Sequence, residues 1–251
     1  MEEKELKILY LYPDILELYG DFGNIQVLSY RLEQRGIKAT IVPYSIGDIE
    51  PNFNDYDLVF AGGGADQEQS ILANDLIKYK ENIKTAIENG VFFLLICGAY
   101  QLFGKYYKGV EGNIIPGLEI FDYYTEAIED RKKRCIGNIV INTNLDGKDT
   151  KIIGFENHGG QTFNVDTPFG DVLFGNGNKF GDFKEGFSKK NVIATYLHGP
   201  LLSKNPELAD YIIKYCMERK YKENIILQPL DDEFESKCRL QLLDRFLNSN
   251  N

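Results

Sequence analysis

Continuous apolar runs alternate with amphipathic stretches along the first hundred residues. Strand-like runs cover residues 6–13, 37–44, 56–64 and 91–97, and helix-like stretches cover residues 24–36 and about 66–89. Uninterrupted apolar runs are typical of strands buried on both faces, whereas spaced apolar residues are typical of helices with one buried face. Repeated strand–helix–strand units indicate a parallel sheet with right-handed crossovers. The pattern therefore predicts an α/β fold with a mostly parallel central sheet and helices on both faces.

The middle of the chain follows a different pattern. Short β-like pieces are separated there by glycine and asparagine turns, at residues 117–128, 135–143, 151–163 and 172–178. Turns at this spacing are typical of antiparallel strands. We therefore expect an antiparallel extension or edge beside the parallel sheet.

The last sixty residues return to the first pattern and then become helical. A buried-strand run covers residues 191–202, a helix follows Asn205, and a charged amphipathic helix extends from about residue 231 to 248. No repeat or clear linker interrupts the chain. We expect one domain over residues 1–251, with a core of about 1–220 and a C-terminal helical extension at 221–251.

Composition and charge narrow the class of protein. The chain has 251 residues, of which 43% are hydrophobic and 13% aromatic, which is enough for a sizeable core. Its formal net charge of −10 argues against a nucleic-acid partner, because phosphate contacts need clustered Lys and Arg. The start does not resemble a signal peptide, and no apolar run reaches the roughly 18 residues of a membrane span. We expect a soluble cytoplasmic protein.

The four cysteines are far apart and form no Cys-x-x-Cys pair; they are Cys97, Cys135, Cys216 and Cys238. This spacing predicts neither a disulfide framework nor a metal site. Free thiols in a reducing cytosol fit it better.

One of these cysteines interrupts the most apolar run of the chain. In "VFFLLICGAYQLFG", residues 91–104, the run stops at Cys97 and breaks at once into Gly-Ala-Tyr-Gln. The pattern predicts a strand, a tight turn and a helix. Cys97 is then either a core residue at a strand end or a nucleophile at the top of the sheet. Ligands of such sheets bind beyond the carboxyl ends of the strands, where glycines 62–64 and His198 are also expected.

A cysteine nucleophile needs a neighbouring base, and the chain has two histidines. His198 ends the buried run "VIATYLHG", so its ring can project where Cys97 projects. A lone histidine at a strand end is usually structural, but beside such a cysteine it becomes a candidate base. His158 lies in "FENHGGQT", which we interpret as a loop, and we expect a structural role for it.

The glycines at 62–64 allow two interpretations. They form either a flexible turn or a backbone that approaches a ligand closely. Acyl transfer needs N–H donors for an oxyanion, and one donor usually follows the nucleophile. We therefore take Gly63, Gly64 and Gly98 as candidate oxyanion donors, with Gly98 at a helix N-terminus that also favours a thiolate. The dinucleotide fingerprint Gly-x-Gly-x-x-Gly does not follow the first strand.

Four ordered motifs carry a resemblance to a known family. "GGGADQEQ", "ICGAYQLFG", "GFENHGGQT" and "TYLHGPLL" resemble those of class I glutamine amidotransferases of the cobyric acid synthase-like branch, and among them the glutaminase subunits of lipid II isoglutaminyl synthases. "LYPDILELYGDFGNI" and "NPELADYIIKYCMERK" also match, so the resemblance covers nearly the whole chain. It implies a flavodoxin-like fold and glutaminase activity, with Cys97 as nucleophile and His198 as its base.

Two positions depart from the family's usual pattern. Ala99 replaces the second glycine of the cysteine motif Cys-Gly-Gly-x-Gln, in which Gln101 is retained as a candidate substrate-binding residue. Pro200 stands where many class I enzymes have the glutamate of a triad. The resemblance therefore implies a Cys-His dyad and leaves open which group orients His198.

The resemblance also implies a substrate-binding arginine. The family places an arginine before a Gly-(Asp or Asn)-Ile-Val strand to hold the substrate carboxylate, and Arg134 stands three residues before Gly137. A guanidinium pairs bidentately with a carboxylate, which an ammonium does less well. Arg131 competes for this role, and a solvated basic loop remains the alternative.

The chain contains no P-loop, so its ammonia must be used elsewhere. The resemblance implies a Mur ligase-like subunit (MurT) that uses ATP and Mg²⁺ to amidate the D-glutamate α-carboxyl of lipid II, at the cytoplasmic membrane face. For this chain itself we expect no cofactor and no metal. The alternatives are a subunit of another synthetase, such as one for a corrinoid, and a cysteine hydrolase or binding module on the same scaffold. Apolar residues of the last helix pack either on their own domain or on a partner; they are Phe234, Leu240, Leu243 and Phe246.

Overall fold

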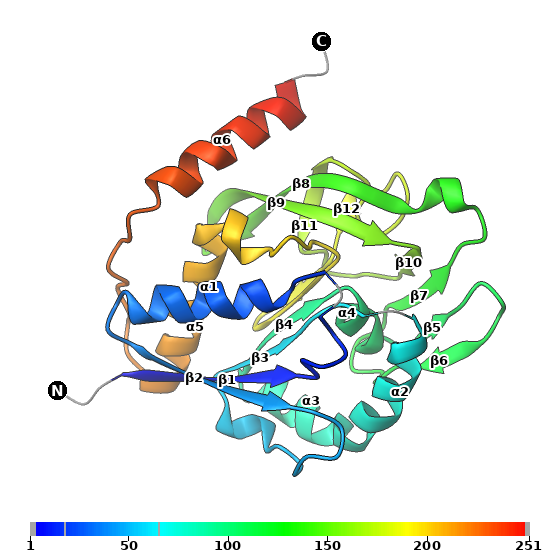
Figure 1. The fold of residues 1–251 in the computed structure, drawn as a ribbon, viewed down its shortest axis with the longest axis horizontal. Helices are drawn as coiled ribbons and strands as arrows, with labels where there is room; N and C mark the ends of the chain where they lie inside the picture. The colour runs from blue at the N-terminus through cyan, green and yellow to red at the C-terminus, as the bar shows by residue number, and fades with distance from the viewer. Residues whose placement is uncertain (1–3, 18, 65, 249–251) are drawn as a thin grey trace.

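The computed structural model describes residues 4–17, 19–64 and 66–248. A six-stranded sheet forms its centre, in the order β13-β14-β4-β3-β1-β2 (Figure 1). Five neighbouring strands pair in parallel: β1 (Glu5–Leu11), β2 (Lys38–Tyr44), β3 (Leu58–Ala61), β4 (Phe92–Ile96) and β14 (Val192–Thr195). The edge strand β13 (Phe187–Lys189) is antiparallel to β14. The predicted mostly parallel sheet is confirmed.

Helices cover both faces of this sheet. The main ones are α1 (Phe22–Glu33), α2 (Asp66–Leu76), α3 (Lys80–Glu88) and α5 (Pro206–Tyr221), with short helices η1 (Phe53–Asp55) and η2 (Ile77–Tyr79) between them. The chain moves from β1 towards one edge through α1 and from β3 towards the other through α2 and α3. Right-handed crossovers in opposite directions place these helices on opposite faces. Helix α5 packs on α1 and β4, and every residue of β4 is fully buried.

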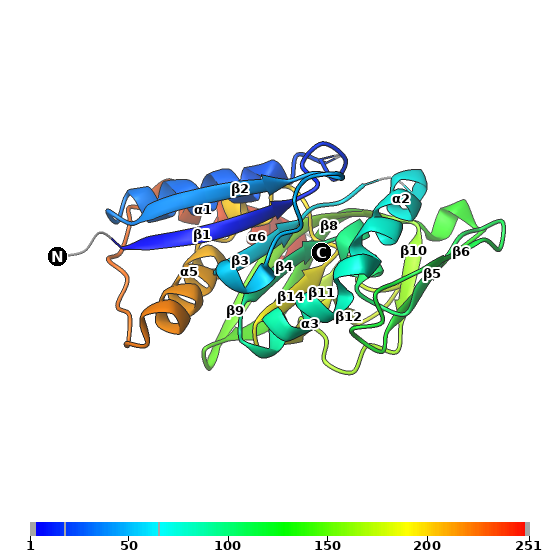
Figure 2. The ribbon, with the colours of Figure 1, turned by 90° about the horizontal axis from the view of Figure 1, so that it is seen from below.

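Two smaller sheets form the expected extension. One has the order β10-β7-β5-β6, built from β5 (Tyr106–Lys108), β6 (Ile114–Pro116), β7 (Tyr124–Ala127) and β10 (Gly160–Phe163). The other has the order β12-β11-β8-β9, built from β8 (Cys135–Leu145), β9 (Lys148–His158), β11 (Gly170–Phe174) and β12 (Lys184–Glu185). The second is antiparallel throughout, whereas β5 and β7 of the first run parallel. Figure 2 shows β5, β6 and β10 together at the end of the molecule far from the N-terminus.

The β8–β9 hairpin is long because its turn has suitable residues. Asp146 and Gly147 lie between the strands with φ values of 50° and 80°. A two-residue turn with both φ positive has a twist that matches the flanking strands, and Asp-Gly is a preferred pair for it. Eleven residue pairs follow from this turn, ending with Cys135 opposite His158.

A C-terminal helix, α6 (Glu233–Asn248), follows an extended segment at the margin of the molecule (Figure 1). Arg31 of α1 anchors that segment, since its guanidinium pairs with Asp210 of α5 at 2.7 Å and with Asp232 at 2.6 Å. The apolar residues predicted either to pack on their own domain or to contact a partner fall into a packed pair and an exposed pair. Leu243 and Phe246 join a small cluster on the β8–β9–β11 sheet, whereas Phe234 and Leu240 are 76% and 66% exposed.

Among the described residues, none of the helices has both the length and the apolar character needed to cross a bilayer.

Candidate active site

Cys97 occupies a strained turn between β4 and the short helix α4 (Gly98–Leu102). Its φ of 51° and ψ of −101° lie outside the regions that residues with a side chain favour. Hydrogen bonds hold it there, because its N–H donates to Thr195 O at 2.8 Å and its carbonyl accepts from Gln101 N at 3.0 Å. A strained strand-to-helix turn is how α/β hydrolases expose a nucleophile above the sheet. The predicted strand, turn and helix are therefore all present.

His198 follows β14, next to β4, and its backbone is bonded to β9. Its N–H donates to Phe155 O at 2.9 Å, and its carbonyl accepts from Phe155 N at 3.1 Å. The buried ring directs Nδ1 to the carboxylate of Asp21, 3.2 Å from both oxygens. Because a carboxylate only accepts, Nδ1 carries the proton and Nε2 is left for Cys97.

Asp21 is the group that sequence reasoning missed. It stands at the N-cap of α1, where an aspartate usually accepts a bond from the helix backbone. Here its carboxylate makes no such bond and instead accepts from Gly63 N at 3.0 Å and from His198. The only signal for Asp21 in the sequence is an aspartate just before a predicted helix, which is ordinary for an N-cap residue. A carboxylate 177 residues away in the chain thus contacts His198, while Pro200 occupies the sequence position of the usual glutamate.

The charge environment of His198 favours its protonated form. Burial alone lowers the pKa of the imidazole, but Cys97 and Asp21 together raise it from 6.5 to about 10. His198 Nε2 has no hydrogen-bond partner among the described residues, so its contact with the Cys97 thiol falls short of hydrogen-bond geometry. Such contacts commonly tighten only when substrate binds. An imidazolium beside a cysteine favours the nucleophilic thiolate.

The three predicted oxyanion glycines lie around Cys97, but their amides differ. A Cβ added to Gly63 would lie 2.9 Å from His198 Cε1 and 3.1 Å from Cys97 Cβ, so only glycine fits between the two side chains. Its N–H is already bonded to Asp21. Gly64 N lies 3.3 Å from the position of a Cβ on Gly98, so the Gly64 amide is close to the residue that follows Cys97. The geometry therefore favours Gly64 and Gly98 as the donors, a role that remains a prediction.

A cavity of about 830 Å³ opens over Cys97. Arg134 and Arg131 both line it, so their positions do not decide between them as carboxylate holders. Gln101 lines it too, but its amide is engaged by protein: Oε1 accepts from Gln69 Nε2 at 2.8 Å, and Nε2 donates to Tyr196 OH at 3.1 Å.

Several polar residues of the cavity wall had not been predicted; they are Glu68, Gln69, Glu111, Glu129 and Asn157. The cavity thus has carboxylates as well as guanidinium groups, which suits a ligand with both an ammonium and a carboxylate. Glu68, Gln69 and Asn157 stand within the quoted motifs, on α2 and β9, but no local pattern showed that they share a cavity with Glu111 and Glu129.

The prediction that His158 lies in a loop is wrong. It ends β9, because the Asp-Gly turn extends the hairpin to this residue. Its ring is buried and stacks on Tyr196, with centroids 3.7 Å apart and planes 8° from parallel. Burial lowers its pKa to about 4, so the ring is neutral.

Residues 7–206 match the CobB/CobQ-like glutamine amidotransferase domain. The chain belongs to this family. The predicted membership is confirmed, and the match spans β1 to the start of α5, including Cys97 and His198. The residues after 206 lie outside the matched region.

Individual relatives show which members of the family this chain resembles in sequence. The chain is 42% identical to the lipid II isoglutaminyl synthase (glutamine-hydrolyzing) subunit GatD of Staphylococcus aureus, over 96% of both chains. It is 40% identical to the GatD subunit of Streptococcus pneumoniae, over 91% of this chain and 86% of that one. A probable cobyric acid synthase of Methanocaldococcus jannaschii is 25% identical, and the match spans half of that protein.

Solved structures agree on the fold. The structure of PurLQS from Thermotoga maritima matches with a TM-score of 0.54 at 17% identity, over 88% of this chain and 100% of that one. A glutamine amidotransferase crystal structure matches with a TM-score of 0.50 at 15% identity, over 83% and 98%. The predicted flavodoxin-like class I amidotransferase fold is confirmed.

Proposed function

We propose that this chain is the glutaminase subunit of a lipid II isoglutaminyl synthase. It hydrolyses L-glutamine and passes ammonia to a Mur ligase-like subunit, which holds ATP and Mg²⁺ and amidates the D-glutamate α-carboxyl of lipid II. The observation that carries the chemistry is the Cys97–His198–Asp21 constellation beneath the cavity. The subunit assignment rests on identities of 42% and 40% over nearly complete chains.

The constellation supports acyl transfer through a thioester. Cys97 Sγ attacks the side-chain amide carbon of glutamine, and the oxyanion receives N–H groups of Gly64 and Gly98. His198 Nε2 donates its proton to the departing nitrogen, the C–N bond breaks and ammonia leaves. Water, deprotonated by the now neutral imidazole, then attacks the thioester, releasing glutamate and restoring the thiol.

Asp21 extends the expected dyad to a triad. Its carboxylate holds the Nδ1–H tautomer of His198 and stabilises the imidazolium, the two roles of the third residue in such sites. The short Gly63 N–H contact fixes the carboxylate itself.

The cavity wall supports recognition of an amino acid. Arg134 suits the α-carboxylate, and the carboxylates of Glu111 and Glu129 lie on the same wall, where they favour an α-ammonium. Gln69 Oε1 is buried and has no hydrogen-bond partner among the described residues, so it can accept a hydrogen bond from the substrate.

The decisive test of the chemistry is Cys97→Ser. A hydroxyl is close in size to the thiol but forms no thiolate at neutral pH, so glutamate release should fall at least about 10³-fold. Assays on the chain with its co-expressed ligase avoid missing an activity that needs the partner. Cys216→Ser, which is also buried but lies on α5, is the matched control and should retain activity. Retention of more than a few per cent of activity by Cys97→Ser would refute the mechanism.

A further inference from the structure

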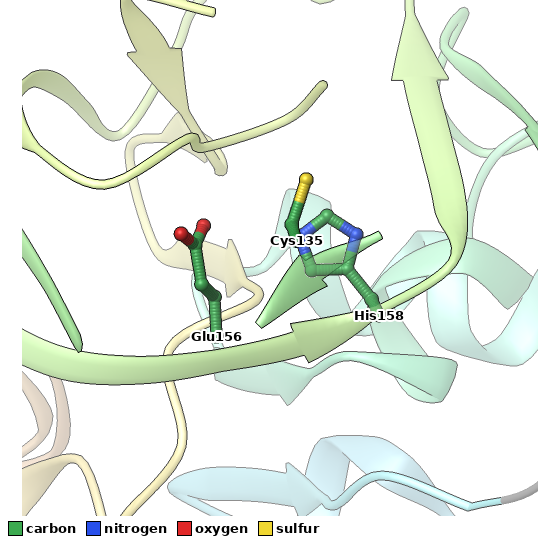
Figure 3. A group of neighbouring side chains, drawn as sticks. All are labelled: Cys135, Glu156 and His158. Carbon is green, nitrogen blue, oxygen red and sulfur yellow. The ribbon is translucent and has the colours of Figure 1, made fainter. Parts of the chain in front are cut away.

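A second group of neighbouring side chains consists of Cys135, Glu156 and His158 (Figure 3), of which His158 lines the cavity. Cys135 begins β8 and is paired in register with His158 at the end of β9. Glu156 precedes His158 by two residues, so both side chains lie on the same face of β9. One donor atom from each residue lies within 4.8 Å of the other two, and all three side chains are buried. The proposed glutaminase mechanism uses none of them.

The imidazole of this group is held with one nitrogen unused. His158 Nδ1 donates to Gly160 O at 2.7 Å, which fixes the tautomer and leaves a lone pair on Nε2. Nε2 is buried and has no hydrogen-bond partner among the described residues. Figure 3 shows one ring nitrogen on the side of Cys135 and Glu156. Metal-binding histidines are oriented in this way, by a backbone carbonyl on the other nitrogen.

The other two side chains are also held by neighbours. Glu156 Oε1 accepts from Asn176 N at 2.9 Å and Nδ2 at 2.8 Å, and Oε2 accepts from Gly177 N at 2.9 Å. Gln161 Nε2 lies 3.8 Å from Cys135 Sγ. Each carboxylate oxygen has more than one lone pair, so these bonds orient Glu156 without excluding a further ligand.

We propose that Cys135, Glu156 and His158 form a binding site for a divalent transition metal ion of the zinc type. A thiolate, an imidazole and a carboxylate are a common zinc donor set, and hard cations such as Mg²⁺ do not favour the thiolate. Bonds of about 2.0–2.3 Å in a tetrahedron need donors roughly 3.3–3.8 Å apart, so the side chains must close by about 1 Å. His158 lines the cavity, so the proposed site adjoins it.

The position of this site connects it with the substrate cavity. Arg134 directly precedes Cys135, and its guanidinium lies over Gly159, where an added Cβ would be 3.0 Å from one guanidinium nitrogen. A bound cation would therefore lie next to the proposed carboxylate holder. This link rests on the proposed function, whereas metal binding does not.

The test uses the full chain with Cys97→Ala, so that the cysteine that lines the cavity cannot bind the ion. Co²⁺ is titrated and the near-ultraviolet thiolate-to-Co²⁺ band is followed, and Zn²⁺ affinity is measured by calorimetry. We expect one equivalent bound, the band, and no competition by Mg²⁺. Adding Cys135→Ser should remove the band and weaken Zn²⁺ binding at least about 10-fold, whereas adding Cys216→Ser should change neither.

Absence of the band in the Cys97→Ala protein would overturn the proposal, and so would a Cys135→Ser protein that keeps the band and the affinity. Thermal unfolding without metal checks that each variant is folded. If Cys135→Ser does not fold, Glu156→Gln takes its place: it keeps the thiolate and an acceptor for the loop amides but loses the charge, so it should weaken Zn²⁺ binding at least about 10-fold, and an unchanged affinity would overturn the proposal. Loss of glutamine hydrolysis in separate Cys97→Ser assays bears on the proposed function alone.

Discussion

Asp21, Cys97 and His198 come from three loops that meet at the carboxyl ends of parallel strands. Backbone hydrogen bonds hold each residue: Cys97 is bonded to Thr195 at the end of β14, His198 to Phe155 of β9, and the Asp21 carboxylate to the amide of Gly63. None of the three could take its position without the others' loops being in place. Two predictions follow from this arrangement, one for the orienting residue and one for the substrate.

Asp21→Asn should lower kcat for glutamine hydrolysis by about 10²–10⁴-fold with little change in KM. An amide can present N–H to Nδ1 and stabilise the wrong tautomer of His198, and it supplies no charge to the imidazolium. Steady-state kinetics of the complex measure both constants. Asp48→Asn, on an exposed turn, is the control and should behave as the parent. A kcat within about 10-fold of the parent would show that Asp21 is only structural.

Arg134→Ala should raise the KM for glutamine more than Arg131→Ala does. Loss of a charge-assisted carboxylate contact of about 1.5–3 kcal/mol corresponds to a rise of about 10- to 100-fold. Both residues line the cavity, so each substitution is the control for the other. Equal and small effects would mean that the basic cluster is only a solvated loop.

At the scale of elements, β12 joins the antiparallel sheet to the end of β14. Glu185 of β12 is fully buried, and its carboxylate accepts from Thr195 Oγ1 at 3.0 Å and from Tyr196 N at 2.7 Å. Burial raises the pKa of this carboxyl from 4.5 to about 8, although the two hydrogen bonds lower it. The junction next to His198 therefore contains an acid that is protonated in the folded protein at neutral pH.

Glu185 should make folding stability pH-dependent. The pKa of Glu185 is higher in the folded protein, about 8, than in the unfolded chain, about 4.5. Its contribution to the free energy of unfolding is therefore complete below pH 4.5 and is lost as the pH rises through about 8. The free energy of unfolding should fall by up to about 3 kcal/mol between pH 5 and pH 8. Glu185→Gln should flatten this fall, as measured by denaturant unfolding at both pH values. Glu156, whose pKa burial also raises, contributes equally to both proteins. The same slope in parent and variant would contradict the assignment.

At the scale of the whole molecule, the fold contains the cavity over Cys97 and leaves apolar side chains of the C-terminal segment exposed. Phe234 and Leu240 of α6 and Ile226 before it are exposed, while Phe246 anchors the same helix to the β8–β9–β11 sheet. The sequence has no P-loop, and ammonia released from glutamine has to reach a second active site if it is to be used. This is the physical reason to expect a stable complex.

The chain should form a complex with a Mur ligase-like subunit through an interface that buries at least about 1,000 Å². Co-expression followed by gel filtration measures association, and lipid II amidation driven by glutamine measures ammonia transfer. Amidation driven by free ammonium is the control for an active ligase. If the ligase neither co-elutes nor gains glutamine dependence while ammonium supports amidation, the cell-wall assignment is wrong and the glutaminase chemistry still stands.

The sequence by itself determined the order of elements, because local pattern decides them. The run ending at Cys97 had to be a buried strand, and the glycine behind it allowed the turn. Cys97 and His198 each stand at the end of a predicted strand, and this was enough to predict that the two side chains lie close together. Ordered motifs identified the family for the same reason, since the catalytic loops follow these strands directly.

Only the tertiary structure decided which distant side chains join them. Asp21 has the sequence signature of a helix cap, and it becomes the partner of His198 because the β1–α1 loop crosses the end of β3. Cys135 and His158 are neighbours because the register of the hairpin pairs them. Loop crossings and strand register depend on packing between segments far apart in the chain, and no local pattern of residues encodes them.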